Sequence, residues 1–468
     1  KSLALGFCLC VVGAAAPSHG AVLQFRAALD AAQVPVASGQ SGLGLISFDT
    51  VTKQLTWSVS FTGLTGSFFA AHFHGPVPAG VDAGVTVGMS GTTSPLVGSA
   101  VLTPTQEAEL LSGQWYVNIH STTYPNGEIR GQVVRVRGDF NGDGNADVFW
   151  RFTDGTNYIW HVNGNVIAGS LLSIPSQGLL PAVDGTWAVA GVGDFNGDGK
   201  LDIFWRRNDG TNYIWHVDGA SINGGVLTIV SQGLLPTVDS TWTVAGIGDF
   251  NGDGKSDIFW RKSDGTNYIW HVDGSLITNS LLSITTQGLL PTVDSTWSVA
   301  GIGDFNGDGK SDIFWRKSDG TNYVWHVNGA LISNSLLSIP SQGLLPTVDA
   351  TWSVAGTGDY NGDGKADLFW RKNDGTNYVW HVDGSVITNS LLSIVTQGLL
   401  PTVDLNWSAV GWGDYNGDGK SDVFWRHTDG TNYVWHVDGN VISNALLSIP
   451  SQGLLPTVGA GWQVQNPK

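Results

Sequence analysis

The feature that most constrains this chain is an internal repeat of 55 residues. Each copy begins with the pattern Asp-x-Asn-x-Asp-Gly-x-x-Asp, and six copies follow one another without an insertion from residue 139 onward. Eighteen of the 21 tryptophans occupy three fixed positions in the repeat. A strict period of this length indicates that each copy is one structural unit that packs against the next copy.

Short apolar runs in each copy predict four β-strands. In the third copy these runs cover residues 257–262, 267–272, about 281–290 and 296–302, and the sequence "SDG" supplies a turn between the first two. Apolar and aromatic runs bounded by glycine, serine and aspartate are typical of short strands joined by tight turns.

Alternate residues of the second run predict how these strands pack. Tyr268, Trp270 and Val272 face one side of the strand, and Ile269 and His271 face the other. Because both sides are largely apolar, each small sheet is expected to lie between two neighbours. Four antiparallel strands repeated six times predict an all-β fold with a six-bladed β-propeller. An open β-solenoid is the alternative, although its repeats are shorter.

The two ends of the repeat region predict how the ring closes. The last copy ends on a spare strand, "GWQVQ" (461–465), whereas the first copy begins at its aspartate loop. The spare strand is therefore expected to complete the first blade. In a competing interpretation "VVRVRG" (133–138) is the first strand, and a seventh blade would then need another source.

The repeated aspartates predict a cation site. In the third copy Asp249, Asn251, Asp253 and Asp257 alternate in a tight loop, with glycine at the sixth position. This spacing can direct side-chain oxygens to one centre, and Lys255 can add its backbone carbonyl while its side chain points away. Ca²⁺ takes six to eight such oxygens in a flexible shell, whereas Mg²⁺ requires a more rigid octahedron. The loop therefore predicts calcium.

Two further observations bear on this prediction. The twelfth position is Trp260 in place of a bidentate glutamate, and a strand follows, so the loop is not part of a helix-loop-helix or dockerin arrangement. The six loops hold 18 of the 39 acidic residues, and the other 21 nearly balance 22 lysines and arginines. Solvated turns and acid–base catalysis are the alternatives, but six equivalent copies lack the asymmetry that paired-acid catalysis needs.

The period, the loop and its flanking strands resemble the FG-GAP/VCBS repeats that form integrin-type propellers and occur in related bacterial exported proteins. The resemblance implies a calcium-stabilised propeller used for adhesion or ligand binding, with about six Ca²⁺ per chain. By position, it assigns ligand roles in all six copies to Asp139, Asn141, Asp143, Asn145, Asp147; Asp194, Asn196, Asp198, Lys200, Asp202; Asp249, Asn251, Asp253, Lys255, Asp257; Asp304, Asn306, Asp308, Lys310, Asp312; Asp359, Asn361, Asp363, Lys365, Asp367; and Asp414, Asn416, Asp418, Lys420, Asp422.

Other polar and aromatic positions also recur, among them Arg261, Tyr268, Trp270 and His271. A glycan-binding protein would use such aromatic faces for stacking and the arginine for hydroxyl groups. In the simpler interpretation the tryptophans are inter-blade core, "SDGTN" is a hairpin turn, and the six equivalent histidines are satisfied structural groups.

Residues 21–137 lack the period and predict a separate β-sandwich domain. "LGLISFD" and "KQLTWSVSFTGL" are typical of strands, and "TPTQEAELLSG" predicts one short helix. Thr103 is the expected N-cap, Pro104 opens the first turn, Gln106 completes a capping box and Gly113 ends the helix.

Two stretches of this domain, "AAHFHGPVPAG" and "GQWYVNIHSTTYPNGEIRGQV", resemble the CHRD domain, for which no chemistry can be transferred. His72 and His74 lie two residues apart on an expected strand, so their imidazoles point the same way. With His120 they could form a three-nitrogen site for Zn²⁺ or Cu²⁺, loosely like the His-x-His strand of copper-zinc superoxide dismutase. The alternative is a hydrogen-bonded structural cluster.

The first 20 residues predict an export signal, with Lys1 before a short apolar core and small residues before a cut ahead of Ala21. An uncleaved anchor is the alternative. Cys8 and Cys10 both lie in this segment, so the mature chain would hold no thiol and no disulfide. No other stretch is long and apolar enough for a transmembrane helix. The net charge of −17 argues against nucleic acid as a partner.

These observations predict a secreted or cell-surface protein with three parts: a signal peptide (1–20), a CHRD-like sandwich (21–137) and a propeller (138–468). The expected role is non-enzymatic binding of an extracellular protein or glycan, with calcium in a structural role. A lectin with repeated inter-blade sites is the first alternative. A metalloenzyme that uses the histidine cluster is the second.

Overall fold

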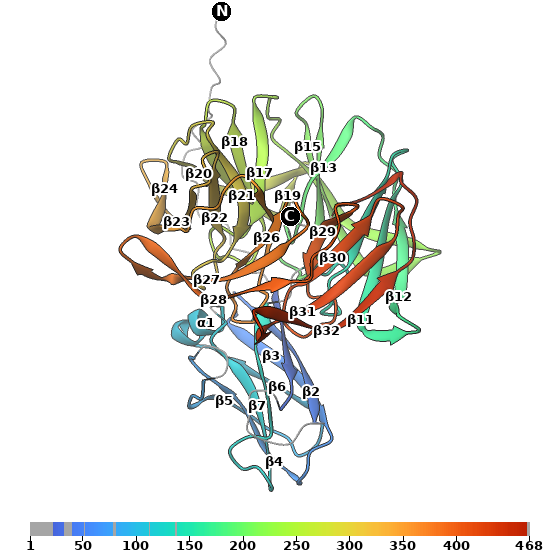
Figure 1. Ribbon diagram of the computed structural model, residues 1–468, viewed down its shortest axis with the longest axis vertical. Helices are drawn as coiled ribbons and strands as arrows, with labels where there is room; N and C mark the ends of the chain where they lie inside the picture. The colour runs from blue at the N-terminus through green and yellow to red at the C-terminus, as the bar shows by residue number, and fades with distance from the viewer. Residues whose placement is uncertain are drawn as a thin grey trace, which may run out of the picture.

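The computed structural model confirms the all-β fold and divides the chain into a small sandwich domain and a propeller (Figure 1). The predicted signal segment lies outside the residues that the structure describes. Those residues are 22–31, 40–50, 52–77, 81–111, 113–135 and 138–465.

The propeller consists of six four-stranded antiparallel sheets arranged in a closed ring. The third blade illustrates all of them, because its strands β17 (Trp242–Gly248), β18 (Asp257–Lys262), β19 (Asn267–Thr278) and β20 (Leu281–Leu290) pair in sequence order. The equivalent strands are β10 (Val148–Phe152), β11 (Asn157–Ala168) and β12 (Leu171–Leu180); β13 (Trp187–Gly193), β14 (Asp202–Arg207), β15 (Asn212–Asn223) and β16 (Val226–Leu235); β21 (Trp297–Gly303), β22 (Asp312–Lys317), β23 (Asn322–Ser333) and β24 (Leu336–Leu345); β25 (Trp352–Gly358), β26 (Asp367–Lys372), β27 (Asn377–Thr388) and β28 (Leu391–Leu400); and β29 (Trp407–Gly413), β30 (Asp422–His427), β31 (Asn432–Ser443) and β32 (Leu446–Leu455).

The predicted strands match the observed ones, except that β19 extends six residues beyond the expected end at Val272. Register shifts between His271 and Val272 and between Asp273 and Ile277 interrupt its pairing with β20, and the two strands end in a largely exposed hairpin. Asn279 and Ser280 close this hairpin, with φ angles of 51° and 64°. Two successive residues with positive φ match the right-handed twist of the flanking strands.

The ring is closed by the last strand, β33 (Trp462–Val464), which pairs with β10 of the first blade. Trp462 lies opposite Phe152, and Val464 lies opposite Trp150. The prediction that "GWQVQ" completes the first blade is therefore confirmed. The competing interpretation of residues 133–138 is wrong, because β9 (Val134–Arg135) pairs with β1 (Val22–Leu29) of the sandwich.

Each blade is buried on both faces, as the alternation in its second strand predicts. Trp270 and Val272 pack with Phe204 of the preceding blade, whereas Ile269 packs with Trp315 of the following blade. Six such inter-blade cores follow one another around the ring. The propeller therefore has no single central core.

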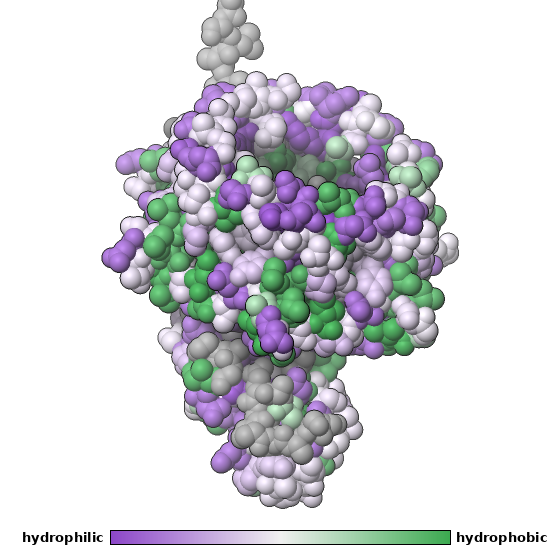
Figure 2. Space-filling view, viewed as in Figure 1, coloured by the Kyte–Doolittle hydropathy of each residue, from purple (hydrophilic) through white to green (hydrophobic). Residues whose placement is uncertain are grey.

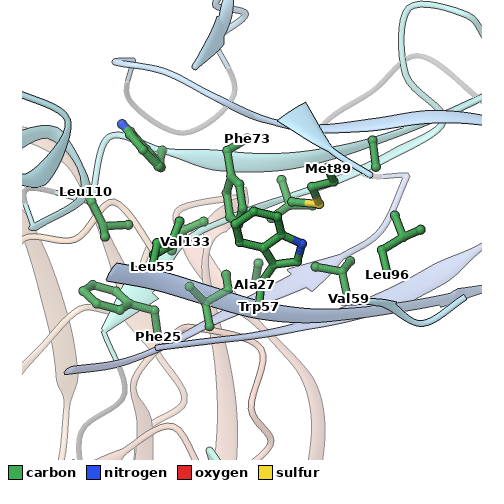
Figure 3. Close-up of a cluster of buried hydrophobic side chains, with 14 of the residues drawn as sticks. Phe25, Ala27, Leu55, Trp57, Val59, Phe73, Met89, Leu96, Leu110 and Val133 are labelled. Carbon is green, nitrogen blue, oxygen red and sulfur yellow. The ribbon is translucent and has the colours of Figure 1, made fainter. Parts of the chain in front are cut away.

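The N-terminal domain is a sandwich of two antiparallel sheets, with strand orders β6-β3-β2-β1-β9 and β5-β4-β7-β8. Its core lies between the sheets, where Phe25 and Trp57 of one sheet meet Phe73 of the other (Figure 3). The remaining strands are β2 (Ser41–Asp49), β3 (Gln54–Thr62), β4 (Phe68–His74), β5 (Val85–Met89), β6 (Leu96–Val101), β7 (Tyr116–Ser121) and β8 (Ile129–Gln132).

The one helix among the described residues, α1 (Pro104–Leu111), has the predicted cap. The backbone amide of Gln106 donates to Thr103 Oγ1 over 3.3 Å, and the backbone amide of Thr103 donates to Gln106 Oε1 over 2.9 Å. Gly113 follows the helix with a φ of 68°, which glycine adopts without strain.

The sandwich sits against one end of the propeller (Figure 1). At this end a cavity of about 250 Å³ is lined by Arg26 and Arg135 of the sandwich and by the first aspartate of several propeller loops. Figure 2 shows a hollow, bordered largely by hydrophilic side chains, at the opposite end of the propeller. The aspartate loops therefore face the N-terminal domain.

Candidate metal-binding loops

Each aspartate loop leads into the second strand of a blade, as the loop between β17 and β18 illustrates; in the first blade it follows β9 of the sandwich. Two glycines shape it, Gly252 with a φ of 77° and Gly254 with a φ of 88°. L-residues with side chains rarely adopt these angles, so glycine at both positions allows the sharp turn. The turn brings the backbone amides of the loop inward, toward its acidic side chains.

The first aspartate is the centre of this arrangement. Asp249 Oδ2 accepts a hydrogen bond from the backbone amide of Gly254 over 2.8 Å, and Asp249 Oδ1 accepts one from Gly252 over 2.7 Å. The third and fifth positions act in the same way, because Asn251 Oδ1 accepts from the amide of Asp253 over 2.8 Å and Asp253 Oδ1 accepts from that of Lys255 over 2.9 Å. Asp249 Oδ1 also accepts from the backbone amide of Asp253 over 3.2 Å, so the backbone encircles the side-chain oxygens.

The ninth residue of the loop, Asp257, lies at the start of β18 and is fully buried. Its Oδ2 accepts from the backbone amide of Phe250 over 2.9 Å, and its Oδ1 accepts from that of Val272 over 3.1 Å. This carboxylate therefore joins the loop to the third strand of the same blade. The same two bonds recur at Asp147, Asp202, Asp312, Asp367 and Asp422.

Burial makes these carboxylates costly to ionise. It raises the pKa of Asp257 well above its ordinary value, and repulsion by the neighbouring Asp253 and Asp249 adds to the shift. The same causes raise the pKa of Asp194 to about 7 and that of Asp359 to about 8. A cation among these oxygens would remove the repulsion and favour the ionised form.

The lysine at the seventh position turns away from the loop, as expected, in copies where an aspartate outside the loop pairs with it. Lys255 Nζ pairs with Asp273 Oδ1 over 2.9 Å, and both side chains are buried. The fourth copy differs, because Asn328 replaces the external aspartate. There, Lys310 Nζ lies 3.6 Å from Asp308 Oδ2 of its own loop.

Two arginines of the sandwich reach into the loops, which sequence reasoning did not anticipate. Arg26 Nη1 donates to the carbonyl of Gly144 over 3.0 Å, and Arg135 Nη2 donates to that of Gly254 over 3.2 Å. Arg135 Nη1 also lies 3.5 Å from Asp249 Oδ2. Both arginines precede the repeats in sequence, so the repeat pattern carries no signal for these contacts.

The structure also brings together the three predicted histidine ligands, His72, His74 and His120. Among the described residues, they are the one group of three or more His, Cys, Asp or Glu side chains placed to hold a metal ion, and their ligand atoms all lie within 4.8 Å of one another. In a propeller loop, a calcium shell would need the asparagine oxygen and a backbone carbonyl besides the three carboxylates.

Most of the repeated aromatic residues are core, as the simpler interpretation predicts. The side chain of Trp260 is 1% exposed, and that of Trp270 is 8% exposed. Arg261 lies 4.9 Å from the ring centre of Trp315 and donates to the carbonyl of Trp297 over 3.2 Å, so it ties adjacent blades together.

His271 and its equivalents are only half satisfied. His271 Nδ1 hydrogen-bonds Thr286 Oγ1 over 2.6 Å, but its buried Nε2 has no hydrogen-bond partner. Burial lowers the pKa of His271 to about 4, so the imidazole is neutral near pH 7. The expectation of fully satisfied structural histidines is therefore too simple.

The third repeated tryptophan is partly exposed and borders a surface cavity. In the fourth blade a cavity of about 240 Å³ is lined by Trp297, Trp315, Tyr323 and Trp325. The rings of Trp297 and Tyr323 meet edge to face, with centroids 6.3 Å apart. Equivalent pairs occur in every blade: Tyr158–Trp462, Trp187–Tyr213, Trp242–Tyr268, Trp352–Tyr378 and Trp407–Tyr433.

Six four-stranded sheets in a closed ring, each with the same acidic loop, define a β-propeller built from loop-bearing repeats. The model of the FG-GAP-like repeat matches this chain in five overlapping segments: residues 139–205, 194–260, 249–315, 304–370 and 359–425. The chain belongs to this family. The model of the CHRD domain matches residues 25–133, which lie within the sandwich.

Other comparisons are less informative. No curated protein matches the chain. Among solved structures, the chain is similar to the crystal structure of Chaetomium thermophilum Raptor at 12% sequence identity and a TM-score of 0.34. This match covers 67% of the present chain, which spans only 25% of the Raptor chain. Within the described residues, no helix has the length and apolar character needed to cross a membrane.

Proposed function

We propose that this protein is an exported, calcium-stabilised propeller that binds an extracellular ligand and takes part in adhesion. The observation that carries the proposal is the sixfold recurrence of one acidic loop, whose ninth aspartate is buried in every copy and whose first and ninth aspartates accept the same backbone hydrogen bonds. Repeats of this family are typical of extracellular proteins, in keeping with the predicted export signal.

The donor set of each loop suits calcium. The loop of the third blade supplies the hard oxygens of Asp249, Asn251, Asp253 and Asp257, and Lys255 has a backbone carbonyl to add. When bound, calcium would neutralise the buried carboxylates and hold the loop to its strands. This chain's own residues already order the loop, because the amides of two glycines and of Phe250 fix the carboxylates before any cation binds.

A binding role is favoured over catalysis. Acid–base catalysis uses two groups whose surroundings push their pKa values apart in a substrate cleft. The ninth aspartate has the same surroundings in the six loops, and burial raises the pKa of Asp147, Asp202 and Asp257 alike. The CHRD and FG-GAP families are also families of binding or structural domains.

A glycan is the second candidate ligand, and the cavity beside Trp297 favours it. Partly exposed tryptophan and tyrosine rings offer apolar faces of the kind on which sugars stack, and Lys317 Nζ lies 5.9 Å from the ring centre of Trp297. Six equivalent aromatic pairs would allow multivalent binding, which raises the overall affinity for a clustered ligand.

Screening the labelled protein, without residues 1–20, on glycan and extracellular-protein arrays in millimolar calcium tests the proposal. We expect calcium-dependent binding to one ligand class. If that class is a sugar, Trp297→Ala together with the matching changes at Trp187, Trp242, Trp352 and Trp407 should weaken binding by about 10-fold or more. Trp462 is kept, because it belongs to the strand that closes the ring. Leu405→Ala, at an exposed residue outside the aromatic pairs, is the matched control. Binding to neither array would contradict the proposed function.

A further inference from the structure

The outer face of the β5-β4-β7-β8 sheet carries a histidine cluster. In the register between β4 and β7, His74 lies opposite Tyr116, and Ala70 lies opposite His120. Because alternate residues share a face, His72, His74 and His120 all project from the side of the sheet that faces away from the core residues Phe73 and Val117. Two adjacent strands thus fix the positions of three imidazoles.

Backbone carbonyls fix the tautomers of two of these rings. His74 Nδ1 donates to the carbonyl of Ala83 over 2.9 Å, and His120 Nδ1 donates to the carbonyl of Pro125 over 2.9 Å. A carbonyl oxygen can only accept, so Nδ1 carries the proton in each neutral ring. The Nε2 atoms of both rings therefore present lone pairs, as in histidine ligands oriented by a second hydrogen bond.

The third ring completes the cluster. His72 Nδ1 lies 3.2 Å from His120 Nε2, and since that Nε2 is an acceptor, the shared proton belongs to His72. His74 is only 7% exposed, and its buried Nε2 has no hydrogen-bond partner. Burial lowers the pKa of all three rings, which favours their uncharged form. An unpartnered buried lone pair is unfavourable in a structural cluster.

The segment that positions His74 is itself anchored. The backbone amide of Ala83 donates to the hydroxyl of Tyr116 over 3.0 Å. Arg130 donates to the carbonyl of Val81 over 3.1 Å and pairs with Asp82 over 3.0 Å. Arg130 also lies 3.5 Å from the ring centre of Tyr116, which stacks on His74. The ligand atom of His74 is therefore preorganised.

We propose that His72, His74 and His120 form a site for one transition-metal dication, Zn²⁺ or Cu²⁺. Three neutral imidazole nitrogens suit these ions and not the calcium expected in the propeller. On binding, His72 would carry its proton on Nε2, and Nδ1 would become the third ligand. His72 is the least buried of the three, so a position left open by three ligands would face the solvent on its side.

Titration of the whole protein without residues 1–20 tests this site. The protein is first freed of transition metals and then kept in millimolar calcium, so that the propeller loops are not the variable. Zn²⁺ and Cu²⁺ are added separately and followed by calorimetry. We expect one ion per chain with a dissociation constant of about 1 µM or lower. The Cu²⁺ form should show nitrogen hyperfine structure in its electron paramagnetic resonance spectrum.

Single variants identify the ligands. His72→Ala and His120→Ala should each weaken binding by about 100-fold or more. His427→Ala is the matched control and should leave the affinity unchanged, because His427 pairs with Asp429 in the propeller. A melting curve of each variant separates loss of binding from loss of fold. An affinity weaker than about 100 µM, or an affinity unchanged in folded His72→Ala and His120→Ala, would overturn the proposal and leave a hydrogen-bonded structural cluster.

Discussion

Chelation of calcium is expected to lower the melting temperature of the propeller by about 10 °C or more. A ligand that binds only the folded state at 100 times its dissociation constant stabilises that state by about 2.7 kcal/mol. Six sites would act together. Without calcium, buried carboxylates within one loop, such as Asp139 and Asp147, repel each other. The predicted loss of stability is therefore large even for weak sites.

Calorimetry with and without chelator, followed by restoration of calcium, measures this effect. Asp257→Asn should reproduce part of it, because Asp257 is a buried loop residue. Asp264→Asn is the matched control, since Asp264 lies in the exposed hairpin turn of the same blade and hydrogen-bonds Thr266. The same melting temperature in chelator and in calcium would refute the prediction.

Removal of residues 461–468 is expected to open the ring and lower the free energy of unfolding by about 5 kcal/mol. The truncation deletes β33, which pairs with β10, and removes Trp462 from its contacts with Phe152 and Tyr158. Loss of a packed tryptophan costs about 3 kcal/mol, and each lost hydrogen bond adds about 1 kcal/mol. Arg426 also loses the carbonyl of Trp462 as an acceptor.

Urea denaturation of the truncated and full-length proteins measures this loss. Deletion of residues 466–468 alone is the control, because it leaves β33 in place. The closing role of β33 would be disproved if the longer truncation unfolded at the same urea concentration as the control.

The propeller could be predicted from the sequence because the same evidence recurs six times. A single copy with two apolar strand faces does not show what covers each face. Six copies with tryptophans at the same positions indicate that each sheet packs against the next in the same way. The capped helix was predictable for a different reason, since Thr103 and Gln106 are only three residues apart and hydrogen-bond to each other. Local and repeated signals therefore account for most of the fold.

The remaining features depend on contacts between distant parts of the chain. Arg26 reaches a loop 118 residues away, and Arg135 reaches one 119 residues away. The pairing of β9 with β1 likewise depends on how the sandwich folds, so residues 133–138 could be mistaken for a propeller strand. The cluster of His72 with His120 was predictable in outline only, because its tautomers depend on the carbonyls of Ala83 and Pro125.

Calcium stoichiometry tests the central claim most directly. Equilibrium dialysis of the protein without residues 1–20, at millimolar free calcium, retains weak sites that gel filtration would lose. We expect about six calcium ions per chain and about five in Asp257→Asn, because each blade contributes one loop. No bound calcium at this concentration would contradict a calcium-stabilised propeller and would leave the repeated aspartates as hydrogen-bonded turns.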